Sequence, residues 1–157
     1  MARERSEKRM EALGDILSDG LNYEWFRVEA LDAEAVTATL LVDTGDYNEE
    51  TDQQIFKRVD VTADDVARGL RMYREYLEGK REMFPGEFKY HAKDAVRAGL
   101  IADEAQFDGP THARARAEAC GWETVKFDRT NGDQGDYDAN TADSVMQFAT
   151  IGQVMFG

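Results

Sequence analysis

Residues 141–157 contain one charged side chain, Asp143, in a protein in which 32% of the residues are charged. A segment with so little charge is best accommodated in a protein interior. We therefore expect this tail to be buried as a hydrophobic anchor against a sheet. Its apolar side chains are Val145, Met146, Phe148, Ala149, Ile151, Val154, Met155 and Phe156.

The composition indicates a folded, acidic protein of one domain, residues 1–157. Hydrophobic residues make up 42% of the chain, which is too many for a disordered sequence. The net charge of −13 repels nucleic-acid phosphates and anionic membranes, so direct nucleic-acid binding and a membrane role are disfavoured.

Cysteine usage and hydropathy indicate the compartment. The lone Cys120 cannot form a disulfide within the chain, which favours a reducing environment. No apolar run approaches the roughly 20 residues that span a bilayer. We expect a cytoplasmic protein.

Three consecutive segments, 23–31, 35–44 and 54–61, alternate apolar and polar residues as strands do, and short links predict an antiparallel meander. Residues 122–128 alternate in the same way and predict a fourth strand. The expected core face of the second strand carries Val36, Ala38, Leu40 and Val42.

Helical spacing predicts helices at both termini and in the centre, over residues 3–19, 63–78 and 141–150. Thr62 and Asp65 form a capping-box pattern before the central helix. The last helix is expected to begin at Asn140 or Thr141. The fold class predicted is α+β: a small antiparallel sheet of three to four strands packed with these helices.

The region between the central helix and the fourth predicted strand has weaker signals. Residues 89–100 and the Ala-rich residues 111–119 predict helices, separated by a break at 108–110. Residues 153–156 are expected to return as a strand or to pack in an extended conformation.

The acidic segment 128–138 is the best candidate for binding, because carboxylate and amide oxygens within one short loop are ligands for calcium or magnesium. Its spacing does not match an EF-hand. The alternative is that Asp, Asn and Gly are there to form tight turns. The candidate partner- or metal-binding residues are Asp128, Asn131, Asp133, Asp136 and Asp138.

Arg68, Arg71 and Arg74 form a basic stripe on the central helix. Glu75 and Glu78 are interleaved with it, so a solvated helix face is the alternative to a phosphate-binding track.

No catalytic motif accompanies these candidates. His91 and His112 lack the partners and spacing of a zinc site, and no nucleophile motif or phosphate-binding loop occurs. The sequence therefore predicts no catalytic residue and no required cofactor.

Several segments resemble small proteins encoded by tailed phages of actinobacteria. The resemblance implies a phage origin and expression inside a host cell, and it transfers no activity or catalytic residue. The segments that carry it are 3–9 (RERSEKR), 64–71 (DDVARGLR), 127–138 (FDRTNGDQGDYD), 141–148 (TADSVMQF) and 152–157 (GQVMFG).

These observations predict an interaction protein that binds and regulates or inhibits a host or phage protein. One alternative is an acidic nucleic-acid mimic, in which the acids of residues 11–65 and 128–138 occupy a DNA-binding protein. The other is a metal-dependent enzyme or Ca/Mg-binding protein that uses Asp133, Asp136 and Asp138.

Overall fold

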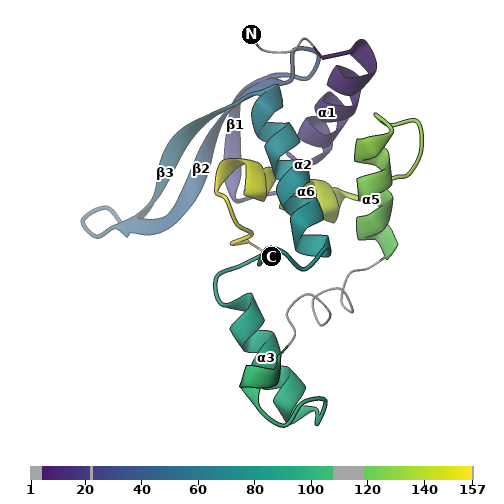
Figure 1. The fold of residues 1–157 in the computed structure, drawn as a ribbon. Coiled ribbons are helices and arrows are strands. Elements are labelled where there is room, and N and C mark those ends of the chain that lie inside the picture. Colours follow the sequence, from purple (N-terminus) through teal and green to yellow (C-terminus); the bar gives the residue numbers. More distant parts are fainter. Residues whose placement is uncertain (1–4, 22, 108–118, 157) are drawn as a thin grey trace.

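The computed structural model describes residues 5–21, 23–107 and 119–156. It shows an α+β architecture, which confirms the predicted class (Figure 1). In chain order the elements are α1 (Glu7–Asp19), β1 (Phe26–Asp32), β2 (Thr37–Asn48), β3 (Gln53–Val61), α2 (Ala63–Leu77), α3 (Glu87–Arg97), the 3-10 helix η1 (Glu104–Gln106), α5 (Ala119–Arg129) and α6 (Ala139–Thr150).

The sheet is an antiparallel meander in the order β1-β2-β3, as the alternation predicts. Leu40 lies between Val28 of β1 and Val59 of β3 in this register. The expected core face is confirmed, because a period of two places alternate side chains on one face. Its buried members within β2 are Ala38, Leu40 and Val42, whereas Val36, expected on the same face, is buried in the turn before β2.

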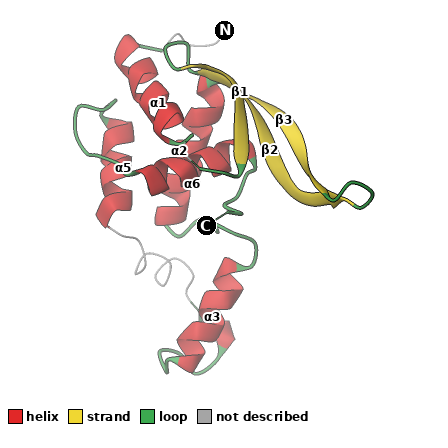
Figure 2. Cartoon of the chain, turned by 180° about the vertical axis from the view of Figure 1, so that it is seen from behind, coloured by secondary structure: helices red, strands yellow, loops and turns green. Residues whose placement is uncertain are grey.

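The β2–β3 hairpin extends beyond the helices as an arm (Figure 1 and Figure 2). A register shift between Asp43 and Tyr47 marks the point where regular pairing is interrupted. Beyond it Tyr47 and Ile55 are exposed. The outer half of the arm therefore contributes little to the core.

Helix α1 begins at Ser6, whose side chain accepts the Arg9 N–H at 3.1 Å. The helix is in close contact with the turn between β1 and β2: a β-carbon at Gly14 would lie 2.5 Å from the Ala33 carbonyl oxygen. Only glycine permits this approach. In the same turn Val36 has a φ of 56° and a fully buried side chain.

Helices α2 and α6 pack closely against each other. The predicted cap of α2 is confirmed, since the Thr62 N–H donates to the Asp65 carboxylate at 2.9 Å. A β-carbon at Gly69 would lie 2.5 Å from the Val145 carbonyl oxygen. The buried face of α2 carries Val66, Leu70, Tyr73 and Leu77, which recur at helical spacing.

The prediction of a fourth strand is wrong, because residues 122–128 lie in helix α5 (Ala119–Arg129). Its buried Gly121, Thr124 and Val125 share one helical face, and a β-carbon at Gly121 would lie 2.9 Å from the Leu77 side chain. Packing against α2 thus overrides the alternation of β-branched and aromatic residues in a short segment.

Helix α3 lies apart from the other helices, below α2 in Figure 1. The prediction of a helix over 89–100 is confirmed with a shift, since α3 begins after Gly86, which has a φ of 79°. The predicted break at 108–110 and residues 111–118 of the next predicted helix lie outside the described residues.

The uncharged tail divides into a buried helix and a half-exposed end. Helix α6 is capped by Asp138, earlier than predicted, because its carboxylate accepts the Thr141 N–H at 2.7 Å. Phe148 is 1% exposed, which confirms that the helical part of the tail is buried, although α6 packs mainly against α2, whereas Met155 is 55% exposed. The end of the tail forms no strand in the described part of the chain.

Candidate functional site

The acidic segment 128–138 is folded against α1. Asp128 lies in the last turn of α5, and its carboxylate accepts from the Arg9 guanidinium at 2.6 Å, while the same nitrogen donates to the Asp128 carbonyl at 2.9 Å. Asp133 pairs with Lys8 at 2.9 Å. Two of the five candidate residues therefore bind the first turn of α1.

The other candidates serve the turn itself. Asn131 has a φ of 52°, a left-handed conformation that Asn tolerates. Asp136 accepts the N–H of its neighbour Tyr137 at 2.8 Å, and Asp138 caps α6. These contacts match the turn-forming alternative.

Tyr137 ties the same segment to α1. Its hydroxyl donates to the Asp19 carboxylate at 2.5 Å, and its ring meets Phe127 edge-on with centroids 4.9 Å apart. Burial and the Asp19 hydrogen bond raise the pKa of Tyr137, so the phenol remains a donor.

Within the described ranges, no group of three or more His, Cys, Asp or Glu side chains is arranged to hold a metal ion. Asp133, Asp136 and Asp138 each have a different partner in the protein. This arrangement gives the calcium or magnesium hypothesis no support.

The arginines of the basic stripe are each paired within α2. Arg68 lies 3.1 Å from Asp65, and Arg71 lies 3.7 Å from Glu75. Arg74 lies 3.4 Å from Glu78. Arg68 also donates to the Ala149 carbonyl of α6 at 2.7 Å. Since acids neutralise the stripe locally, the solvated-face alternative describes it better than a phosphate track.

Sequence reasoning missed a buried polar network beneath the tail. Asp143 accepts from the Trp25 indole N–H at 2.6 Å and from the Gln147 amide at 2.8 Å. Burial raises the pKa of Asp143, although these two hydrogen bonds oppose the shift. The single charged residue in an uncharged segment was the available signal.

Gln147, which is fully buried, connects this network to the end of the chain. Its side-chain oxygen accepts the N–H groups of Met155 and Phe156, and its amide donates to the Phe156 carbonyl at 2.7 Å. The Phe156 ring stacks on Trp25 with centroids 6.0 Å apart and planes 5° apart. These contacts attach the end of the chain to Gln147 of α6 and to Trp25.

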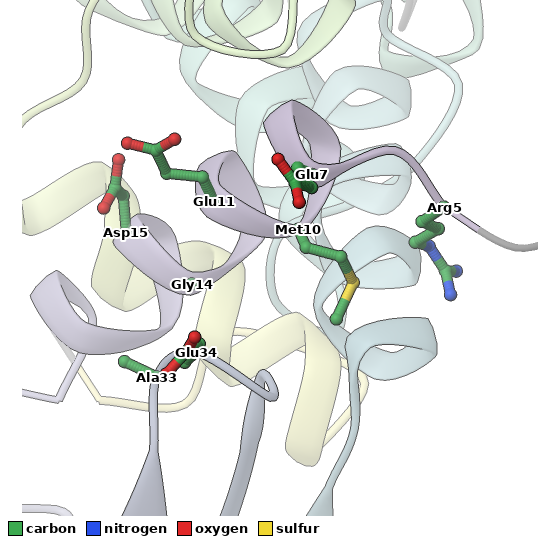
Figure 3. A pocket seen from close by; sticks show the side chains of 8 residues that line it. All are labelled: Arg5, Glu7, Met10, Glu11, Gly14, Asp15, Ala33 and Glu34. Atoms are coloured by element: carbon green, nitrogen blue, oxygen red, sulfur yellow. The ribbon is translucent and has the colours of Figure 1, made fainter.

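An acidic groove of about 660 Å³ lies between α1 and the β1–β2 turn (Figure 3). Glu7, Glu11 and Asp15 recur every four residues on α1 and are exposed, and Glu34 lines the groove from the turn. Figure 3 shows Glu11 and Asp15 side by side, with Arg5 pointing away from them. Arg5 pairs instead with Asp64 at 2.5 Å.

The acids that α1 contributes to the groove have no ion pair in the described part of the chain. Glu7, Glu11 and Asp15 have no cationic side chain within ion-pair distance in the described residues. Burial, together with the charges of Glu11 and Asp19, raises the pKa of Asp15. Like charges at this spacing destabilise a helix. Arg5 also lines the groove but pairs with Asp64, so the three acids of α1 form an anionic row without an ion-pair partner among the described residues.

Comparisons with protein-family models, with curated proteins and with solved structures each found no match. Of the helices that the structure describes, none combines the length and apolar character needed to cross a membrane.

Proposed function

We propose that the protein is a phage-encoded interaction protein that acts in the host cytoplasm. In this proposal, the acidic groove along α1 binds a Lys- or Arg-rich segment of a host or phage protein, and this binding regulates or inhibits that partner. The phage origin rests on the resemblance of the terminal segments and of residues 64–71, and the binding mode rests on the groove.

The observation that carries the proposal is the row of Glu7, Glu11 and Asp15 beside Glu34. Elsewhere in the described chain many acids are paired, as Asp128 is with Arg9 and Glu78 with Arg74. The unpaired row repels itself, and a partner's cations would relieve that repulsion. Complementary charge accelerates association and excludes anionic competitors.

The test compares two variants with the same change in net charge. The first carries Glu7→Gln, Glu11→Gln and Asp15→Asn; the matched control carries Glu49→Gln, Glu50→Gln and Asp52→Asn at the tip of the arm. Partners are captured from host lysate at low and high salt, identified, and then measured with purified components.

We expect the α1 variant to lose at least tenfold in affinity and the arm variant to stay within threefold. Circular dichroism and thermal melts confirm that both variants are folded. Equal losses would show that the arm acids contribute as much as those of α1, as mimicry or nonspecific attraction to a protein of charge −13 requires, and would reject the groove as the specific site. An unchanged affinity of the α1 variant would reject the groove as the binding surface.

Nucleic-acid mimicry is the second candidate, and the arm favours it. Asp46, Glu49, Glu50 and Asp52 are exposed and have no cationic partner in the part of the chain that the structure describes. They add a second anionic surface to that of α1. A mimic must compete with duplex DNA for its partner, so displacement of the partner by DNA supports mimicry, and simultaneous binding rejects it.

A further inference from the structure

A second cavity, of about 270 Å³, lies where the arm leaves the body. The inner face of β2 and β3 forms one wall, and the end of α6 with the tail forms the other. The two walls come from residues far apart in sequence. The apolar side chains lining the cavity are Val42, Val59, Ile151, Met155 and Phe156.

Lys57 of β3 also lines this cavity. Among the residues that the structure describes, no carboxylate lies within ion-pair distance of it. Asp43 lines the same cavity, but its two oxygens accept from the Gly45 N–H at 2.8 Å and the Gln54 amide at 3.1 Å. Lys57 is thus a cation beside an apolar cavity, and no carboxylate of the described residues serves as its counterion.

The tail wall is held in place before any ligand binds. Gln147 binds the backbone of Met155 and Phe156, and Trp25 stacks on the Phe156 ring. Hydrogen bonds from Trp25 and Gln147 to Asp143 fix these two side chains in turn. Because this wall is already ordered, ligand binding does not incur the entropic cost of ordering a mobile segment.

We propose that this cavity binds a hydrophobic carboxylate, whose apolar group contacts Val59, Ile151 and Phe156 and whose carboxylate pairs with Lys57. A dry cavity of about 150 Å³ can hold benzene, so 270 Å³ suits an apolar group of roughly six to eight carbons. Charge complementarity at Lys57 selects an acid over an alcohol of the same length. This site is separate from the acidic groove and does not depend on the proposed function.

Two sources supply this chemistry: a free medium-chain carboxylic acid, or the C-terminal carboxylate of a partner chain that ends in an apolar residue. The net charge of −13 repels both, so the apolar contact provides most of the affinity and Lys57 provides the selectivity. Octanoate represents the first source and the peptide acetyl-Gly-Gly-Leu the second.

The experiment measures binding to the full chain by titration calorimetry, with ¹H–¹⁵N spectra to locate it at Ile151 and Phe156. The ligands are octanoate, 1-octanol, and the peptide as its free acid and as its C-terminal amide. The variant is Lys57→Gln, and Lys93→Gln on α3 is the control with the same change in charge.

We expect an acid to bind about tenfold more tightly than its uncharged counterpart, and Lys57→Gln to remove this difference while Lys93→Gln retains it. The probe acid that binds more tightly shows which of the two sources the cavity favours. Equal binding of acid and uncharged ligand, shifts located elsewhere, or no binding of either acid at millimolar concentration would overturn the proposal. The acidic α1 variant provides a further check, because it should bind octanoate at least as well as the wild type.

Discussion

Gln147 holds Phe156 by both of its backbone polar groups: the side-chain oxygen accepts the Phe156 N–H at 2.9 Å, and the side-chain amide donates to the Phe156 carbonyl at 2.7 Å. An extended tail outside a sheet has no neighbouring strand to satisfy these groups. The buried glutamine replaces that strand. It also keeps Phe156 against Trp25, at the wall of the apolar cavity.

Replacing Gln147 with Ala should destabilise the protein by about 2–4 kcal/mol, because it empties a fully buried position and removes the hydrogen bonds to the tail. Urea denaturation measures the loss, and hydrogen exchange at Met155 and Phe156 should accelerate. The control Gln153→Ala, whose side chain donates to the Met155 sulfur, should change stability by less than about 0.5 kcal/mol. Equal effects would contradict the role assigned to Gln147.

Phe148→Ala should cost about 3–5 kcal/mol, because Phe148 is 1% exposed and its removal leaves a cavity in the core. Phe84 is 40% exposed, so Phe84→Ala is the matched truncation and should cost about 1 kcal/mol or less. Denaturant midpoints with unchanged slopes provide the comparison. A loss well under 1 kcal/mol for Phe148→Ala would show that α6 is not an anchor.

The stability of the protein should depend on the ionisation of Asp143. Burial raises the pKa of Asp143 in the folded state, so the folded protein retains this proton at a higher pH than the unfolded chain does. Its contribution to stability is therefore greatest below the ordinary carboxyl pKa and declines as the pH rises through the raised value.

Between pH 7 and pH 4, the wild type should gain stability relative to Asp143→Asn, as measured by urea denaturation at each pH. Subtracting the variant removes the titration of the other acids, including Asp15, whose pKa is raised in the same direction. Asp133→Asn, which alters an exposed pair, is the control. A relative loss on acidification would mean that the pKa of Asp143 is lowered.

Two neighbouring cations on α1 should differ in their contribution to stability. Arg9 and Asp128 are 22% and 13% exposed, whereas Lys8 and Asp133 are 67% and 59% exposed. Arg9→Met should cost about 1–3 kcal/mol, because it leaves a partly buried carboxylate without its partner. Lys8→Met should cost less than about 0.5 kcal/mol.

Thermal and urea denaturation of the two variants, repeated at high salt, provide the measurement. Added salt should screen the Lys8 pair and leave the Arg9 effect largely intact. If both variants lose the same small amount of stability, then Asp128 does not depend on Arg9, and the attachment of α5 to α1 lies elsewhere.

Local sequence patterns correctly predicted most of the elements. The alternation around Leu40 predicted the central strand and its buried face, and Thr62 with Asp65 predicted the start of α2. Both signals act over a few residues. Residues 122–128 were predicted wrongly because seven residues are too few to separate the two periods, and the helix depends on Gly121 meeting Leu77 of α2.

The candidate site was less predictable than the fold. The acids of 128–138 were visible in the sequence, but their partners Arg9 and Lys8 lie 119 and 125 residues away along the chain. The row of Glu7, Glu11 and Asp15 could be read from its spacing. The absence of a described ion-pair partner for this row could not be read from the sequence, because the ion pair between Arg5 and Asp64 forms only in the folded protein.

The sequence by itself determined the α+β class, the meander and the buried part of α6, because periods of two and 3.6 residues place apolar side chains on one face wherever the segment packs. The tertiary structure alone decided which charges are neutralised and which polar groups are buried. Asp143 and Gln147 have ordinary polar side chains. They form a buried network only because the fold places Trp25 and the end of the chain against α6. Such contacts depend on distances in space between residues that no local pattern relates.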